Sequence, residues 1–496
     1  MTRFKHGETL PLETEHRALN ANRPIHKTWP FGYMFPELQH DKCNLLENSP
    51  ETVSNLRELG KSMRDPGEGK IHGIPAQSIH TYFGQFVDHD ITLERASDAI
   101  SLKDPRVLAL EEVTKNIVNS RSPELELDSV YGPNLDGVLS PRDPRNPAKM
   151  LIAEVEPFGG LPAGKDPFHD FPRNPKDHSA LIGDPRDDEN IVVEQIHIAF
   201  LRAHNALIDR GYRFDEARKL LRQHHQWIVL DDFLERIADS NIVKLIRQRG
   251  PRFFNPPHRA FFMPLEFTVA AFRFGHSRVR AGYDDFNDKR ESAPLHLLFR
   301  PSRRLTDDWI IEWPSFLDPE DPGRFPRPLD TSLTARLLEL PPDTLPGKDP
   351  ETNLAIRNLL RGFILRMPTG QAVARAMAAQ GVEPMTPDEI ESVAKAFPYE
   401  PPGQGQPEKP DQVATLKKGG FFERTPLWFY ILAEAAFYSR GHRLGPVGST
   451  IVAEVMIAII RNSTDSILSE CRWTPTLGSA PGKFEIEDLL KLAGVF

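Results

Sequence analysis

Cysteine is almost absent from this chain of 496 residues, which contains only Cys43 and Cys471. Two cysteines cannot build the disulfide framework of a small secreted domain, although one long-range bridge remains formally open, so reducing surroundings are the simpler interpretation. An excess of positive charge is also lacking, because the formal net charge is −9 and the isoelectric point is about 6.0. This balance excludes the basic surface that nucleic acids and anionic membranes select.

Long apolar runs are missing as well. No stretch approaches the about 20 consecutive apolar residues of a membrane-spanning helix. The first 20 residues, MTRFKHGETLPLETEHRALN, contain no apolar segment of the roughly 7 to 15 residues that a secretory signal needs. We therefore expect a cytoplasmic protein, with non-classical secretion as the alternative.

Proline is abundant instead, with 46 residues, well above the average share of about 5%. The prolines gather in residues 141–178, 314–350 and 397–411. Between them, apolar residues recur with helical spacing in several segments: 190–210, 214–249, 264–280, 351–379, 426–439 and 447–470. Alternating strand patterns are scarce and no internal repeat is present. We predict a mainly α fold, a single large helical domain with long Pro-rich loops and little β-structure.

The segment HTYFGQFVDHDITLE, residues 80–94, is the first with candidate chemistry. If it is helical, Gln85 and His89 lie one turn apart on one face, whereas Asp90 is turned by about 100° from His89. One helical turn could therefore serve two sites. The alternative is that His89 is an ordinary hydrogen-bonded histidine, and this segment alone does not decide.

The segment MPLEFTVAAFRFGHSRVR, residues 263–280, places a second histidine in apolar surroundings. The spacing predicts one helix with four side chains on a common face: Val269, Phe272, His276 and Val279. An imidazole in an apolar stripe is costly without a partner, so a metal or a hydrogen-bond acceptor is expected there. The alternative is a core histidine that bonds a backbone carbonyl. Arg273 precedes His276 by about one turn.

A third segment, ALIGDPRDDENIVVEQIHIAFLRAHN, places Arg186 in a Gly- and Pro-containing loop directly before a long helix. Such an arginine could be an ordinary loop charge. Other histidines of the chain are interpreted as structural: His197, His204, His224 and His225.

The order of four motifs, GQFVDHD, LDSVYG, GDPRDDEN and FRFGHS, resembles the peroxidase-cyclooxygenase superfamily, whose animal-type haem peroxidases include myeloperoxidase and lactoperoxidase. The similarity continues through residues 358–377 and 444–455, and covers roughly residues 70–470. It implies an N-terminal extension, residues 1–70, packed on a haem peroxidase domain, residues 71–496. We expect the chain to be a bacterial member.

The resemblance assigns roles to five residues. His89 matches the distal histidine, Gln85 the glutamine that helps to hold distal water or halide, and Arg186 the distal arginine. On the other side of the haem, His276 matches the ligand of the haem iron and Arg273 the arginine that pairs with a haem propionate.

These residue types suit the implied chemistry. A neutral imidazole can take a proton from one peroxide oxygen and return it to the other near pH 7. A fixed guanidinium stabilises the charge that develops on the departing oxygen. The implied activity is a haem peroxidase that reduces hydrogen peroxide through a compound-I-type ferryl intermediate and acts in the response to oxidative stress. Phenols and other small electron donors are the expected partners, with iodide or bromide as further candidates.

The resemblance also implies a calcium site. The family binds Ca²⁺ with the aspartate after the distal histidine, here Asp90, and with a loop whose matching ligands are Ser122, Glu124, Glu126 and Asp128. Glu124 would contribute its backbone carbonyl, and Glu126 stands where the family usually has aspartate. Hydroxyl, carboxylate and carbonyl oxygens are the ligands that Ca²⁺ selects. The alternative is a solvated acidic loop. A cation there would fix the distal helix.

Two carboxylates match the positions that form ester bonds to haem in mammalian relatives, Asp88 and Glu189. The cofactor is therefore expected to be haem b or an ester-linked derivative. Asn190 replaces the methionine of the additional sulfonium link in myeloperoxidase, so that bond is not expected.

Asn358 in NLLRGFILRMP is a partial match to the asparagine that bonds the second nitrogen of the iron-ligating imidazole. Arg361 and Pro368 agree with the family pattern, whereas residues 363–366 do not, so an ordinary helix amide is the alternative. This bond would set the redox potential of the iron and hence the strength of the oxidant.

Two other functions remain to be weighed. The dioxygenase branch of the superfamily oxidises fatty acids through a tyrosyl radical, on a tyrosine three residues before the proximal histidine, and that position is Arg273 here. A non-catalytic haem-binding sensor would be expected to lack His89 or Arg186, and both are present. The sequence does not indicate an oligomeric state.

Overall fold

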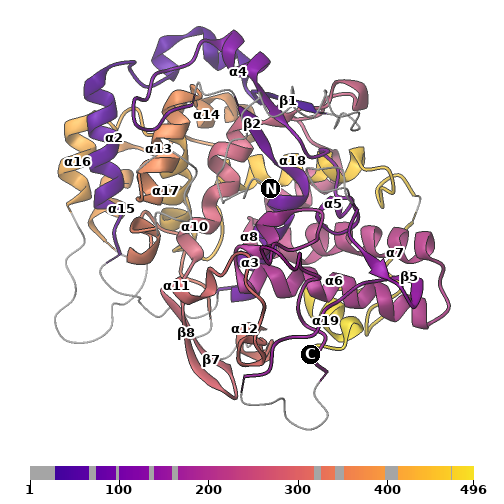
Figure 1. Cartoon of the computed structure of the whole chain (residues 1–496). Coiled ribbons are helices and arrows are strands. Elements are labelled where there is room, and N and C mark those ends of the chain that lie inside the picture. The colour runs from indigo at the N-terminus through magenta and orange to yellow at the C-terminus, as the bar shows by residue number, and fades with distance from the viewer. Residues whose placement is uncertain are drawn as a thin grey trace, which may run out of the picture.

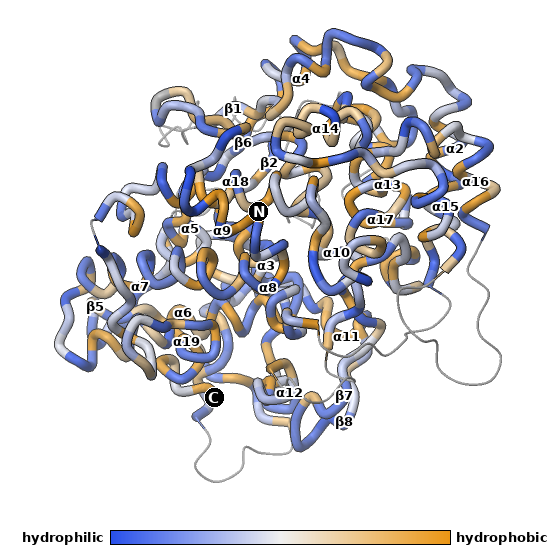
Figure 2. Tube along the Cα trace, turned by 180° about the vertical axis from the view of Figure 1, so that it is seen from behind, coloured by the Kyte–Doolittle hydropathy of each residue, from blue (hydrophilic) through white to orange (hydrophobic). Residues whose placement is uncertain are grey.

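Two apolar helices, α17 (Leu427–Ser439) and α18 (Pro446–Asn462), lie in the interior of the molecule (Figure 2). Residues 427–436 and 447–460 are buried without exception, as expected for helices that are covered on all sides. The buried carboxylate of Glu434 accepts the backbone N–H groups of Val447 and Gly448 and so ties α17 to the start of α18. Burial raises the pKa of Glu434 to about 8.

The structure is a computed structural model that describes nine ranges: residues 28–65, 74–96, 100–132, 139–158, 166–317, 325–340, 351–396, 411–470 and 472–496. Parts of all three Pro-rich segments, residues 1–27 and Cys471 lie outside these ranges. Cys43 is an exposed free cysteine.

Other helices pack around α17 and α18 (Figure 1). Helix α2 (Pro50–Ser62) packs against α13 (Leu354–Ile364) and α16 (Gln412–Gly419). Helix α6 (Ile191–Asp209) contacts its neighbours α3 (Ser78–Ile91), α7 (Phe214–Trp227) and α19 (Ile486–Ala493). The remaining α-helices of the described residues have ten residues or fewer: α4 (Leu110–Asn116), α5 (Asp128–Tyr131), α8 (Leu234–Ile237), α9 (Ser240–Arg249), α10 (Gly275–Arg278), α11 (Leu295–Leu298), α12 (Pro314–Leu317), α14 (Gly370–Ala376) and α15 (Pro387–Lys395).

The β-structure of the described residues is limited to one small sheet and two hairpins, which confirms the predicted mainly α fold. The sheet has the order β2-β3-β1-β6: β2 (Glu94–Ala96), β3 (Ile117–Asn119), β1 (Trp29–Gly32) and β6 (Met263–Pro264). Strand β1 is antiparallel to β3 and parallel to β6. The hairpins pair β4 (Arg142–Asp143) with β5 (Asn146–Met150) and β7 (Gly282–Asn287) with β8 (Arg290–Pro294). The sheet thus joins the chain after α3 to the segment that leads to His276.

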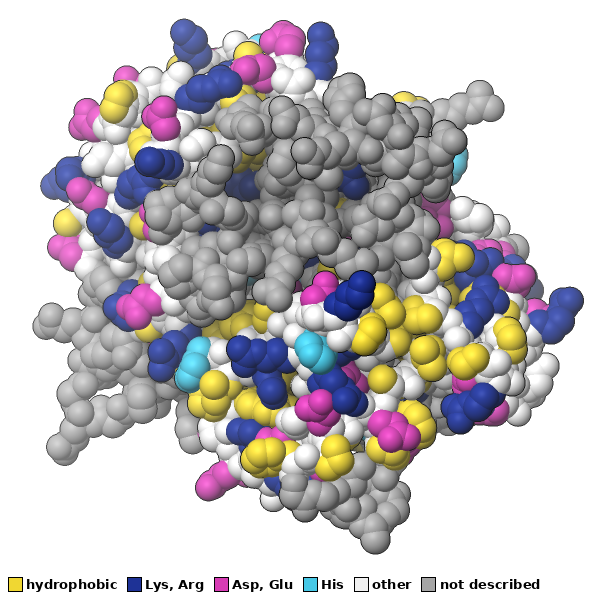
Figure 3. Space-filling view, in the orientation of Figure 1, with side chains coloured by type: hydrophobic (Ala, Val, Ile, Leu, Met, Phe, Trp, Pro, Cys, Tyr) yellow, Lys and Arg dark blue, Asp and Glu magenta, His cyan; other side chains and the backbone are white. Residues whose placement is uncertain are grey.

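The described surface carries both charges. On the face shown in Figure 3, Lys and Arg side chains lie among Asp and Glu side chains. Among the helices that the structure describes, none is long and apolar enough to cross a membrane.

The predicted continuous helix at residues 264–280 is wrong in detail. A π-helical turn at Glu266–Ala270 is followed by a 3₁₀ turn at Ala271–Phe274 and then by the one-turn helix α10. The backbone leaves the helical region at Ala270, where φ is −126° and ψ is −69°. An apolar pattern with one fixed period cannot show such a change of helix type, and π-helical turns frequently occur at functional sites.

Candidate active site

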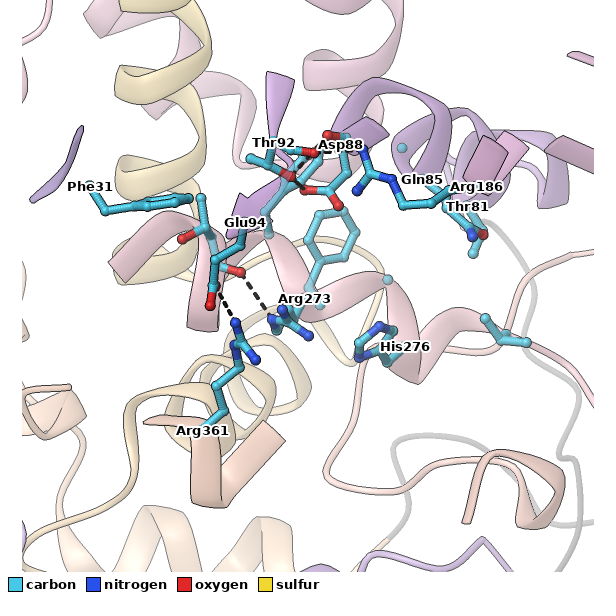
Figure 4. Close-up of a pocket in the computed structure, with 16 residues that line it drawn as sticks. Phe31, Thr81, Gln85, Asp88, Thr92, Glu94, Arg186, Arg273, His276 and Arg361 are labelled. Atoms are coloured by element: carbon cyan, nitrogen blue, oxygen red, sulfur yellow. Dashed lines mark hydrogen bonds and ion pairs between the residues drawn. The ribbon is translucent and has the colours of Figure 1, made fainter. Parts of the chain in front are cut away.

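A cavity of about 1060 Å³, including its opening to solvent, lies between α3 and the segment from Thr268 to Val279. Figure 4 shows two groups of polar side chains around it. Gln85, Asp88 and Arg186 lie on one side, and Arg273 and His276 lie on the other.

His276 contacts a buried amide. The side-chain nitrogen of Asn358, on α13, lies 2.8 Å from His276 Nδ1, at the contact that the partial motif match predicts. Asn358 Oδ1 accepts a hydrogen bond of 3.2 Å from Nη1 of Arg273. Burial, and then the nearby guanidinium of Arg273, lower the pKa of His276 to about 3. The imidazole is therefore neutral near pH 7, which is the form that binds iron.

Arg273 faces the cavity as a cation without a carboxylate partner among the residues that the structure describes. Its Nε donates to the carbonyl oxygen of Thr268 at 2.9 Å. Burial, and then repulsion by Arg361, lower the pKa of Arg273 to about 10, so it stays charged at neutral pH. Arg361 itself forms an ion pair with Glu94 (Figure 4). An anion bound in the cavity would neutralise the positive charge of Arg273.

Helix α3 turns one narrow face to the cavity. Its lining residues follow the helical repeat, with one adjacent pair, and continue beyond the end of the helix: Thr81, Gly84, Gln85, Asp88 and Thr92. The Thr92 hydroxyl donates to the Asp88 carboxylate at 2.9 Å. The predicted ester carboxylate Asp88 and the predicted distal glutamine Gln85 therefore both reach the cavity.

Arg186 is held in place by several contacts. It lies in a 3₁₀ helix, Pro185–Asp188, and its Nη2 forms an ion pair of 2.7 Å with Asp184. Nη2 also donates to the carbonyl oxygens of Thr92, at 2.6 Å, and His89, at 3.1 Å. Burial alone would lower the pKa of Arg186, but Asp184 outweighs this effect and raises the pKa, so the guanidinium remains charged.

His89 follows Gln85 by one turn of α3, as predicted, but it is not among the residues that line the cavity. Its side chain is fully buried, and its Nδ1 lies 2.7 Å from Oδ1 of Asp187. His89 follows Asp88 by about 100° around the helix axis and so lies at the edge of the face that lines the cavity.

Sequence reasoning missed the partners of His89. Asp187 also accepts a hydrogen bond from Nδ1 of His197, at 2.7 Å from its Oδ2. His197 had been interpreted only as structural, and nothing in the spacing of the two residues along the chain indicates this contact. The one available signal was the position of Asp187 directly after Arg186.

The second predicted ester residue is placed differently from Asp88. Glu189 is buried and does not line the cavity, and its backbone carbonyl accepts the N–H of Arg300 at 3.2 Å. Asn190 caps α6, because its side chain accepts the N–H of Val192. Only one of the two predicted ester carboxylates therefore faces the cavity.

The predicted calcium loop lies against α3. The carboxylate of Asp90 accepts the N–H groups of Leu127, at 3.1 Å, and Asp128, at 2.5 Å. The Ser122 hydroxyl donates to Glu126. The Glu124 carboxylate instead accepts the N–H and hydroxyl of Thr464, at 2.7 and 2.8 Å.

The acidic groups of this loop repel one another. Burial, and then Asp128, raise the pKa of Glu126 to about 7, and burial together with the charge of Asp90 raises that of Asp128 to about 6 against the opposing effect of Arg121. Within the described ranges, however, no group of three or more His, Cys, Asp or Glu side chains has the arrangement of a metal site. The calcium site stays a prediction.

Haem fits the residues of the cavity. A neutral imidazole, His276, is available as an iron ligand, and the uncompensated guanidinium of Arg273 suits a carboxylate such as a propionate. Phe272 and Val279 supply apolar surface on the same wall. The residues therefore have the chemistry to hold the cofactor that the resemblance implies.

Comparisons with known proteins relate part of the chain to haem peroxidases. The profile of the animal haem peroxidase family matches residues 105–317, a range that includes Arg186, Arg273 and His276. A peroxidasin homologue of Caenorhabditis elegans is 25% identical over 385 residues, 62% of this chain and 29% of that protein. Human lactoperoxidase is 29% identical over 154 residues, 27% of this chain and 20% of its own length. The chain thus matches less than a third of these relatives.

Solved structures share the fold. Peroxidase A from Dictyostelium discoideum superimposes with a TM-score of 0.55 at 17% identity, covering 85% of this chain and 84% of that one. A fatty acid alpha-dioxygenase of Oryza sativa superimposes with a TM-score of 0.53 at 12% identity, covering 86% of this chain and 74% of its own. The matched profile relates residues 105–317 to the animal haem peroxidase family, and the described chain shares its fold with peroxidase A of Dictyostelium discoideum.

Proposed function

We propose that this protein is a haem peroxidase that reduces hydrogen peroxide and oxidises small electron donors. The observation that carries the proposal is the arrangement across one cavity of His276, backed by Asn358, and of Gln85 and Arg186 on the other side. The match of residues 105–317 to the animal haem peroxidase family supports the same reaction class.

On the proximal side, His276 would hold the haem iron through Nε2, with its ring proton on Nδ1, the nitrogen that faces the Asn358 amide. Arg273 would pair with a propionate. The bound haem supplies the redox chemistry of peroxide cleavage. The protein then has to orient the peroxide, move its proton and stabilise the charge of the leaving oxygen.

On the distal side, Arg186 supplies a fixed positive charge that needs no reorientation during the reaction. Gln85 would hold water or a halide next to the reacting oxygens. His89 would serve as the proton shuttle through Nε2, the ring nitrogen that Asp187 does not engage. Catalytic contacts commonly tighten only once ligands are bound, so the buried ring of this structure is compatible with the role.

Phenols and similar one-electron donors are the proposed substrates, with iodide or bromide after them and chloride least favoured. The alternative function is that of a fatty-acid dioxygenase, since this chain shares its fold with the rice enzyme. It is disfavoured because Arg273, which cannot form a tyrosyl radical, stands at the position of the radical tyrosine. An ester bond from Asp88 to the haem and a Ca²⁺ ion at Asp90 belong to the same proposal.

The test is an absorption spectrum of the purified, haem-supplemented protein before and after hydrogen peroxide, followed by haem extraction with acidified solvent. The expected result is a Soret band that changes rapidly with peroxide and recovers as a phenol is oxidised. Haem that stays with the protein in acid would support an ester bond. Oxygen uptake with linoleate would favour the dioxygenase, and an unresponsive Soret band the sensor.

A further inference from the structure

We propose that Asp187 is the positioning residue of His89, and that it acts by holding the proton of that imidazole on Nδ1. This inference rests on the proposed function, because it assigns Asp187 to the proton shuttle of the peroxidase. It uses only the observed contact between the His89 imidazole and the Asp187 carboxylate.

The geometry is a carboxylate shared by two imidazoles. Asp187 Oδ1 lies 2.7 Å from His89 Nδ1, and Asp187 Oδ2 lies 2.7 Å from His197 Nδ1. All three side chains are fully buried. They come from three elements, since His89 lies on α3, Asp187 in the 3₁₀ helix before α6, and His197 on α6 itself.

The carboxylate is charged. Burial alone would raise the pKa of Asp187, but the hydrogen bonds from His197 and His89 outweigh burial and lower it. A carboxylate can only accept hydrogen bonds, so each imidazole has to donate from Nδ1. Both rings are therefore fixed in the tautomer that carries its proton on Nδ1, and the lone pair of His89 is left on Nε2.

The two acidic residues near Asp187 in the chain pair with arginines, whereas Asp187 pairs with histidines. Asp184, three residues earlier, pairs with the guanidiniums of Arg186 and Arg121, each at 2.7 Å. Asp188, the next residue, pairs with Arg173 at 2.7 Å. Among the described residues, Asp187 forms its ion pairs only with the two histidines. Its two oxygens therefore bond imidazoles, although its charge also contributes to the raised pKa of Arg186.

The contact with Asp187 affects how well His89 can accept a proton. A shuttle has to accept a proton on the nitrogen that faces its substrate and keep its other nitrogen protonated, which a carboxylate behind the ring ensures. Without Asp187, the His89 ring could adopt the other tautomer or turn, and the fraction able to accept a proton would fall. Haem binding, which depends on the opposite wall, would not change.

Two measurements test the proposal. The first uses haem-free protein with ¹⁵N-labelled histidine rings, in which long-range ¹H–¹⁵N NMR spectra report the tautomer of each ring. In the wild type, His89 and His197 should both carry the proton on Nδ1. In Asp187→Asn, whose amide has one accepting oxygen, at least one of the two rings should lose this form. A wild-type His89 protonated on Nε2 would overturn the proposal.

The second measurement is the association rate of cyanide with the haem-loaded ferric protein. Hydrogen cyanide has to give its proton to a base before the anion binds the iron, and here the acceptor would be His89 Nε2. Asp187→Ala should slow association about tenfold or more. Asp187→Glu should restore part of the rate. Asp188→Asn, a matched change of a buried acid in the same 3₁₀ helix, should leave the rate unchanged.

The outcomes separate the two proposals. Unchanged cyanide association in a folded, haem-loaded Asp187→Ala would overturn the positioning role and leave the peroxidase proposal standing. A wild type that never takes up haem would remove the peroxidase proposal, while the tautomers of the haem-free protein would still decide whether Asp187 sets the imidazoles. If Asp187→Ala does not fold, the wild-type spectrum and Asp187→Asn still decide.

Discussion

His276 and Asn358 lie 82 positions apart in the chain, and the amide of Asn358 lies 2.8 Å from the imidazole Nδ1. The amide nitrogen faces the ring because the amide oxygen accepts a hydrogen bond from Arg273. An iron-ligating imidazole that carries its proton on Nδ1 needs an acceptor there instead. Asn358 and Arg273 together therefore control the electronic character of the proposed ligand.

Replacing Asn358 by aspartate tests this control. The Asp side chain could accept hydrogen bonds from both Arg273 and the Nδ1–H of His276. The ligand would gain imidazolate character, which stabilises ferric iron, so the Fe(III)/Fe(II) potential should become more negative. Spectroelectrochemical titration measures it. Asn353→Asp, at the N-cap of the same helix, keeps its capping interaction and should leave the potential unchanged.

His276→Ala should lose or loosen haem, because the proposed iron ligand is removed. Soret absorbance after haem titration and desalting measures the retained cofactor. His204→Ala, whose ring bonds Tyr131 and Ala148 away from the cavity, is the comparison and should retain haem. Full haem retention by His276→Ala would refute the assignment of the ligand.

Arg186→Lys should keep the haem and lower the rate of the peroxide reaction by about 10²-fold or more, because a fixed bidentate charge is replaced by a flexible one. Stopped-flow absorbance provides the rate. The lysine keeps a cation next to Asp184, which avoids leaving that buried carboxylate unpaired. A rate equal to that of the wild type would show that the guanidinium does not act on the leaving oxygen.

Glu434 predicts a pH dependence of stability. Its pKa in the folded protein is about 8, raised by burial above the about 4.3 of an unfolded chain. The folded state therefore binds the proton more tightly, and stability should fall as the pH rises between these two values. Glu434→Gln should flatten this dependence in urea unfolding at pH 5 and pH 8. The exposed Glu423→Gln should behave like the wild type.

The general fold could be predicted from the sequence because the apolar spacing of α6, α17 and α18 reports helices directly. The break at Ala270 could not, since the apolar pattern continues through the change of helix type. Of the four residues predicted to share one helix face, Phe272, His276 and Val279 line the cavity despite this break. The fourth, Val269, is buried and does not line it.

The candidate site shows the same division. Motifs identified His276, Arg186 and Asn358, because each motif constrains a residue type at a fixed spacing. The contacts of His89 could not be predicted, since Asp187 and His197 meet it only after α6 has folded against α3. The absence of His89 from the cavity lining also depends on how α3 is set against the cavity, which helical periodicity alone does not fix.

The most direct test of the account is stopped-flow Soret absorbance of the haem-loaded wild type and of His89→Ala after mixing with hydrogen peroxide. The account predicts a rapid change in the wild type and a rate about 10²-fold or more lower in His89→Ala, with equal haem content in both. A wild type whose haem does not respond to peroxide, or a His89→Ala protein that reacts at the wild-type rate, would contradict it.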